Sequence, residues 1–206
     1  VSNGLKSLFS NTTGGYNISL GADSMYYNTT GEFNTAVGYQ SLYSKSDIEN
    51  GISNYNVAVG YKSMYSNYSG GNNTSIGKDS LYRNITGSNN VAIGDSSGYD
   101  NVSGFNNVFI GKNAKSSFST VYNSMALGYN SSVSSNNTIQ LGNDLIVSVT
   151  TSGKLTTGSL TYPNTDGTSG QLLVTDGNGT IGFNSNIKLV DNSLSISGKL
   201  YGDGSE

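Results

Sequence analysis

The residues that usually carry enzyme chemistry are largely missing from this chain of 206 residues, which contains no histidine and no cysteine. Imidazole and thiolate groups are therefore absent, which excludes Ser–His and Cys–His nucleophilic pairs and the common nitrogen and sulfur metal sites within the chain. Thirteen Asp and Glu residues remain, and a pair of them could in principle hydrolyse a glycosidic bond. None recurs at a fixed place in the repeat described below. We expect no enzymatic activity and no catalytic, cofactor-binding or metal-binding residue.

Two segments could instead bind a ligand. The segment 176–180, Asp-Gly-Asn-Gly-Thr, is superficially like a calcium loop but lacks the later Gly and Glu of an EF-hand, so a hairpin turn is the better interpretation. A row of tyrosines from Tyr26 to Tyr99 could stack on sugar rings as a receptor surface. Its strict register favours a structural ladder of packed aromatic rings. The Asn-x-Ser/Thr sequons are interpreted as turn residues, as at Asn11, Asn28, Asn73 and Asn84.

These side chains belong to a repeat whose clearest copy is Asn-Val-Ala-Ile-Gly at 90–94. The sequence numbers of successive closing glycines differ by 17, 17, 22, 17, 17, 17, 17 and 14. Such a fixed period is the signature of a repeat architecture. The closing glycines are Gly4, Gly21, Gly38, Gly60, Gly77, Gly94, Gly111, Gly128 and Gly142.

Each repeat contains one short segment that alternates apolar and small residues, such as Val91-Ala92-Ile93. Period-two alternation with β-branched residues predicts a strand with one face on a core, and we expect the apolar pair, here Val91 and Ile93, to face inward. In the complete unit the closing Gly is followed by two variable residues, a Ser, an apolar residue and an aromatic residue, and then by Asn, Thr and Gly turn residues. A unit of this length is too short for a strand and a helix but suits one coil of a β-solenoid.

Two intervals depart from the common period. The longest, from Gly38 to Gly60, places five extra residues within 44–55, where we expect a loop that bulges between coils. The shortest, from Gly128 to Gly142, suggests a trimmed turn. The repeat ends near 145, which predicts two regions, a solenoid over 1–144 and a β-hairpin-rich region over 145–206. In the second region we expect strands at 146–149 and 154–156, a hairpin turning at Asp176-Gly177, and strands at 187–190 and 194–196.

Composition limits the partners of the chain. Apolar residues are 34% and charged residues 11% of the sequence, both low, yet the 15 Tyr and the periodicity favour an ordered protein. A net charge of −3 with scattered Lys and Arg gives no basic patch for nucleic acid. No apolar run approaches the length of a membrane-spanning helix, so we expect no membrane insertion. The chain begins at Val1 inside a repeat, which suggests an excerpt of a longer polypeptide.

The apolar content also predicts self-association. Two inward positions per coil provide too few apolar side chains to offset the entropy of ordering the whole coil. A second surface of the same kind would supply the missing contacts at every level of the stack. We therefore expect an oligomer, and we expect Val59→Asp to prevent its assembly.

The segments Asn56-Val57-Ala58-Val59-Gly60-Tyr61-Lys62-Ser63 and Met125-Ala126-Leu127-Gly128-Tyr129-Asn130-Ser131 resemble repeats from the head domains of trimeric autotransporter adhesins and from viral and phage tail-fibre proteins. The resemblance covers about residues 4–142 and implies a left-handed parallel β-roll and a homotrimer. The segment 160–180 resembles the stretch that precedes an endosialidase-type intramolecular chaperone in fibre proteins, which favours the fibre group.

The function implied by this resemblance is structural. We expect part of a trimeric virus or phage tail fibre, located on the virion surface or otherwise extracellular, that mediates host attachment. Its partners would be its own copies and a host cell-surface receptor or glycan. The head of a bacterial trimeric autotransporter adhesin, on the bacterial outer surface, is the second interpretation, and a glycan-degrading fibre is the third.

Overall fold

The computed structural model describes most of the chain as two units, Val1–Ile146 and Val147–Glu206; the boundary expected from the sequence lay between 144 and 145. The described residues are 1–44, 53–146, 148, 150, 152, 155–157, 160–162, 171–175, 181–190, 193–196 and 199–201.

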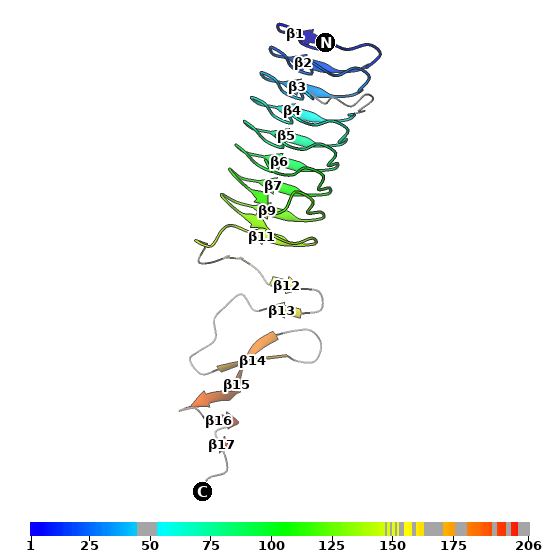
Figure 1. The fold of residues 1–206 in the computed structure, drawn as a ribbon. Helices are drawn as coiled ribbons and strands as arrows, with labels where there is room; N and C mark the ends of the chain where they lie inside the picture. Colours follow the sequence, from blue (N-terminus) through cyan, green and yellow to red (C-terminus); the bar gives the residue numbers. More distant parts are fainter. Residues whose placement is uncertain are drawn as a thin grey trace. The chain divides into compact units, whose positions relative to one another are not determined.

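The first unit is a β-solenoid, as the sequence predicted. Within its described residues, nine short strands form one parallel sheet in which each strand pairs with the equivalent strand of the next coil (Figure 1). The pairing is in register, so that Thr74, Ser75 and Ile76 lie opposite Val91, Ala92 and Ile93. The strands are β1 (Ser2–Asn3), β2 (Ile18–Leu20), β3 (Thr35–Val37), β4 (Val57–Val59), β5 (Thr74–Ile76), β6 (Val91–Ile93), β7 (Val108–Ile110), β9 (Met125–Leu127) and β11 (Ile139–Leu141). The left-handed sense of the coil stays a prediction.

The structure corrects the sequence-based assignment of the strand faces. The central residue of each strand from β2 to β7 points into the coil; it is usually small, and Ala36, Ala58 and Ala92 are fully buried. The flanking apolar residues point outward: Val91 is half-buried and Ile93 is 38% exposed. The physical reason is the width of the coil, because a larger side chain enters from the opposite turn and leaves room only for Ala or Ser on the strand.

That larger side chain is the Leu or Met that follows the spacing Gly-x-x-Ser in the earlier coils. Met25, Leu42, Met64 and Leu81 are all buried in the core, and all have left-handed backbone conformations, with φ near +50°. A β-branched residue would be strongly strained in this conformation, which accounts for Leu and Met at this position. The coil interior is therefore a column of Leu and Met packed against a column of Ala and Ser.

The closing glycine is required at the corner after each strand. Gly60 has a φ of +136°, and a Cβ atom at this position would lie 2.4 Å from the carbonyl oxygen of Gly77 in the next coil. No L-residue fits this contact without displacing the backbone. The period of the glycines is thus fixed by the close approach of successive coils.

A ladder of buried asparagines, not anticipated from the sequence, forms another corner of the solenoid. The Oδ1 atom of Asn73 accepts a hydrogen bond from the backbone N–H of Asn90 at 2.9 Å, and the Nδ2 atom of Asn73 donates to the carbonyl of Gly87 at 2.8 Å. The same pattern joins coil to coil, and the residues are nearly inaccessible to solvent. Each amide satisfies backbone groups that the turn leaves unpaired. The ladder comprises Asn17, Asn34, Asn56, Asn73, Asn90 and Asn107.

The two irregular intervals are absorbed outside the sheet. Thr35 pairs with Val57 across the long interval. Before the extra residues, the N–H of Ser44 donates to the carbonyl of Tyr65 in the next coil. The loop predicted for the extra residues lies within 45–52, outside the described residues. Met125 pairs with Ile139 across the short interval, although Lys115 still pairs with Ser132 at the usual spacing. The short interval is therefore trimmed in the turn after 133, as predicted.

The last coils differ on a second face. Here the turn that carries Leu or Met in earlier coils becomes a pair of parallel strands, β8 (Lys115–Ser116) and β10 (Ser132–Val133). Ser116 and Val133 point inward and are buried, whereas Lys115 is exposed. This change in backbone geometry determines where the aromatic ladder described below ends.

The second unit is β-rich and antiparallel, as expected. The predicted hairpin at Asp176-Gly177 is confirmed by the pairing of β14 with β15, and the predicted strands at 187–190 and 194–196 pair as β15 with β16. The strand predicted at 146–149 is wrong, because Ile146 and Ser148 lie in no strand. The strand predicted at 154–156 corresponds to β12, which pairs with β13. The strands are β12 (Leu155–Thr157), β13 (Leu160–Tyr162), β14 (Gln171–Thr175), β15 (Ile181–Val190), β16 (Ser193–Ile196) and β17 (Lys199–Tyr201).

Candidate functional surfaces

The outward face of the parallel sheet is a largely apolar surface, which we call the strand-face stripe. Each three-residue strand of this sheet, that is β2 to β7, β9 and β11, contributes its first and third residues, which recur at the coil spacing of about 4.8 Å. Several are markedly exposed, including Ile18 at 42%, Ile76 at 41% and Leu141 at 44%. Contiguous exposed apolar surface of this kind is typical of an interaction site. The stripe consists of Ile18, Leu20, Thr35, Val37, Val57, Val59, Thr74, Ile76, Val91, Ile93, Val108, Ile110, Met125, Leu127, Ile139 and Leu141.

The predicted aromatic ladder is confirmed. The rings of Tyr65, Tyr82 and Tyr99 are stacked nearly parallel, with centroids 5.0 Å apart. The row begins at Phe9 and Tyr26 and continues through Tyr43. Because each ring covers the face of the next, rings inside the ladder show only their edges to solvent. They cannot stack on a sugar, and the interior of the ladder is structural.

Two ionisable groups on or beside this ladder have shifted pKa values. Burial, followed by a hydrogen bond with Tyr27, raises the pKa of the Tyr43 phenol to about 12. The pKa of Lys62 is also raised, chiefly by a hydrogen bond with Tyr61, and its ammonium lies 5.4 Å from the ring centroid of Tyr65. Both groups therefore keep their ordinary protonation states at neutral pH and are not poised for acid–base chemistry.

A second set of stacked aromatic rings lies just before the asparagine ladder and was missed from the sequence. Tyr16 stacks on Phe33 at 4.8 Å and Phe33 on Tyr55 at 5.0 Å, and Phe105 stacks on Tyr122 further along. Tyr16, Phe33 and Tyr55 lie five residues before their closing glycines, whereas Phe105 and Tyr122 lie six residues before theirs and form a separate short stack. Each stack extends over only two or three coils, which obscured the signal in the sequence.

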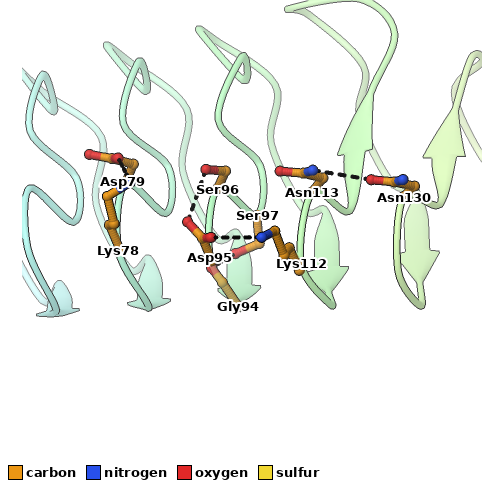
Figure 2. A network of polar contacts seen from close by, with 9 residues as sticks. All are labelled: Lys78, Asp79, Gly94, Asp95, Ser96, Ser97, Lys112, Asn113 and Asn130. Carbon is orange, nitrogen blue, oxygen red and sulfur yellow. Dashed lines mark hydrogen bonds and ion pairs between the residues drawn. The ribbon is translucent and has the colours of Figure 1, made fainter.

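Polar and charged residues form a row along another face of the stack (Figure 2). Lys112 pairs with Asp95 of the preceding coil at 3.4 Å, and Lys78 pairs with its neighbour Asp79 at 3.1 Å. The hydrogen bond to Asp79 raises the pKa of Lys78. The lysine of each pair is largely exposed, so each pair contributes little to folding.

Two ladders end in the coil that follows Gly94. The face of Tyr99 opposite Tyr82 carries no stacked ring among the described residues, because the next residue of the row is the inward-pointing Ser116. A short second asparagine row ends at Asn101, whose Nδ2 donates to Asn84 at 2.8 Å and whose Oδ1 is buried without a partner. The tyrosine ladder and this second asparagine row thus stop in the same coil.

A surface cleft of about 630 Å³ lies beside Tyr99, within the size range of ligand sites. It is lined by Ser96, Tyr99, Asp100, Asn113, Lys115 and Asn130. A neighbouring cleft of the same volume shares Asp100 and Lys115 and extends toward Arg83 and Ser117. The sequence shows where the tyrosine row stops, but the residues of the cleft come together only through the stacking of three coils.

The remaining features considered from the sequence are a possible metal site, a membrane-spanning helix, the segment 176–180 and the Asn-x-Ser/Thr sequons. In the part of the chain that the structure describes, no three acidic residues gather as a metal site, and no helix is long and apolar enough to cross a membrane. The segment 176–180 lies outside the described residues. The sequon asparagines Asn28, Asn73 and Asn84 are buried and contribute to the ladders.

Comparison of the chain with protein-family models, with curated proteins and with solved structures finds no match. The resemblance to adhesin heads and tail fibres therefore stays a prediction. The strand-face stripe extends along the parallel sheet, and the cleft beside Tyr99 combines an aromatic ring, amides and charged groups.

Proposed function

We propose that this chain is a structural and attachment protein, part of a homotrimeric virus or phage tail fibre that contacts the host surface. The observation that carries the proposal is the strand-face stripe. An apolar row along one side of a regular stack is unfavourable in water and is stabilised when another surface covers it. The proposed role is mechanical and adhesive, not catalytic.

Further copies of the same chain are the occupants that fit this surface best. The stripe repeats with the coil, so a parallel, in-register copy places an apolar residue opposite an apolar residue at every level. Val59 of one copy would meet the equivalent β4 surface of another, and Ile76 the equivalent β5 surface. A cyclic assembly buries the stripe of each copy in the same way. The number three comes from the resemblance of the repeats.

The fold suits the proposed role in a second respect. Every coil is hydrogen-bonded to the next through its sheet strand, and the buried asparagine ladder joins the same coils at another corner. Such a unit is long and regular rather than globular, as a spacer or projecting fibre requires. The virion surface, or another extracellular position, is the proposed location.

Analytical sedimentation of the whole chain at micromolar concentration tests the proposal. The expected species has three times the 21.5 kDa mass of one chain. Val59→Asp, on the stripe, should yield monomers, because assembly would bury an unpaired carboxylate in each copy. A wild-type chain that sediments as a folded monomer at this concentration would contradict the proposal.

A further inference from the structure

The aromatic ladder ends with one ring whose face is open. Tyr99 is covered on one side by Tyr82, with 5.0 Å between ring centroids and an interplanar angle of 3°. On its other side the chain forms β8, and the side chain of Ser116 in the equivalent position turns into the coil. An aromatic face beside a cleft can take a flat apolar surface in place of the missing ring.

The cleft surrounds this open face with polar groups from later coils. Asn113 and Asn130 are hydrogen-bonded to each other, with Nδ2 of Asn113 donating to Oδ1 of Asn130 at 3.1 Å (Figure 2). This bond leaves the Oδ1 atom of Asn113 and the Nδ2 atom of Asn130 without a partner among the described residues. One free acceptor and one free donor therefore line the same cleft.

The charges of the cleft are unequal. Asp100 is paired with Arg83 at 3.1 Å, whereas the exposed Lys115 has no carboxylate partner among the described residues. An unpaired ammonium beside a partly enclosed surface attracts a negatively charged group. The cleft thus combines an aromatic face, an amide donor and acceptor, and one uncompensated positive charge.

We propose that this cleft binds a pyranose sugar that carries a carboxylate, as in a uronic or sialic acid. The C–H face of the sugar ring stacks on Tyr99, its hydroxyls bond to Asn113, Asn130 and Asp100, and its carboxylate pairs with Lys115. The role as a host-attachment site rests on the function proposed above, and the cleft supplies the ligand class that this function leaves open. A cleft of about 630 Å³ holds one or two sugar rings.

The test uses the complete chain with glucuronate and N-acetylneuraminate as probes, glucose as the neutral comparison, and saturation-transfer NMR with titration calorimetry. Both acidic sugars should bind, and Tyr99→Ala and Lys115→Ala should each weaken binding at least about tenfold. Tyr99→Phe should retain binding because it keeps the aromatic face. Tyr65→Ala, inside the ladder, and Lys112→Ala, outside the cleft, should leave it unchanged.

Sedimentation of the same samples separates the two proposals. Lys115→Ala at an exposed position should keep the wild-type mass, so its loss of binding reports on the cleft alone. Absence of binding to both acidic sugars by an intact oligomer would overturn the cleft assignment and leave the fibre untouched. Binding by a chain that sediments as a monomer would support the cleft and overturn the fibre. Equal binding of glucose would overturn the assigned role of Lys115.

Discussion

The ring of Phe109 occupies the space that a side chain at Gly98 would need. A Cβ atom at position 98 would lie 2.8 Å from Cδ2 of Phe109 and 2.9 Å from Cδ2 of Leu81. In earlier coils the strand carries Ala or Ser and the turn carries Leu or Met; here the strand carries the large residue and the turn carries glycine. The volume of the core is therefore conserved while the two positions exchange size.

This exchange predicts strong coupling between the two positions. Phe109→Ala should destabilise the unit by about 3–5 kcal/mol because it leaves a cavity, and Gly98→Leu should destabilise it by steric overlap. The double variant restores the Ala92–Leu81 type of pair and should be more stable than either single variant. Denaturant unfolding of all four proteins measures the coupling, and additive effects would contradict the packing described.

If the strand-face stripe is the interface, the effect of a substitution on assembly depends on whether the side chain lies on the stripe, and not only on how exposed that side chain is. Ile93 on the stripe is 38% exposed, and Ile85 in a turn is 41% exposed. Ile93→Asp should dissociate the oligomer, whereas Ile85→Asp should leave its mass unchanged, because only the first side chain lies on the proposed interface. Sedimentation distinguishes the two, and equal behaviour of the variants would place the interface elsewhere.

The buried asparagine ladder predicts a pH-dependent variant. In Asn90→Asp the carboxyl group would face the carbonyl of Gly104, to which the Nδ2 atom of Asn90 donates at 2.8 Å. Burial and the facing carbonyl should raise the pKa of this carboxyl above its unfolded value of about 3.9. Stability should then be fullest below that unfolded pKa and be lost as pH rises through the raised folded pKa.

Thermal unfolding across the acidic to neutral pH range measures this effect. The exposed neighbour Asn89 provides the matched control, because Asn89→Asp places the same charge in water and should show little dependence on pH. A flat stability profile for Asn90→Asp would show that the ladder accepts a carboxylate.

Tyr43 predicts a loss of stability at high pH in the natural chain. Its pKa is raised to about 12 from an ordinary value of 10.0, so the folded state holds the phenolic proton more tightly than the unfolded state. The contribution is full below the ordinary pKa and is lost as pH rises toward the raised one. Tyr43→Phe should show a smaller decrease in unfolding temperature over this interval, and identical profiles would contradict the shift.

The closing glycines predict a sharp difference between two alanine substitutions. Gly60→Ala should severely destabilise the solenoid, because its Cβ would meet the Gly77 carbonyl at 2.4 Å in a backbone conformation with φ of +136°. Gly15→Ala should have little effect, because its Cβ would have only the side-chain oxygen of Glu32 nearby, at 3.9 Å. Circular dichroism during thermal unfolding compares them, and equal stability would contradict the corner geometry.

The sequence was sufficient to predict the coil and its period but not which face of the strand lies inside. Alternation shows that Ala92 lies opposite in direction to Val91 and Ile93, but it does not say which set is enclosed. Assigning the larger residues to the core is usually right in a broad domain. In this narrow coil the Leu81 row already fills the interior, and only Ala or Ser fits opposite it.

The polar core was missed for a related reason. Asn73 and Asn90 are residues typical of turns, and nothing in their type distinguishes an exposed turn from a buried ladder. The cleft beside Tyr99 was beyond the sequence because its lining depends on the change from turn to β8 and on the stacking of three coils. The only feature of the sequence that pointed to the cleft was the replacement of the aromatic residue by Ser116 in the tyrosine row.

Each strand of the parallel sheet is hydrogen-bonded only to the strands of the preceding and following coils. A force applied to one end of the solenoid would therefore act on the coils one after another. Detachment of the coil between β5 and β6, where Thr74 pairs with Val91, would release a segment whose fully extended length is about 60 Å. The longer rung between β3 and β4, where Thr35 pairs with Val57, releases about 75 Å. Under tension the solenoid would unfold coil by coil, and each step would lengthen the chain and dissipate mechanical energy.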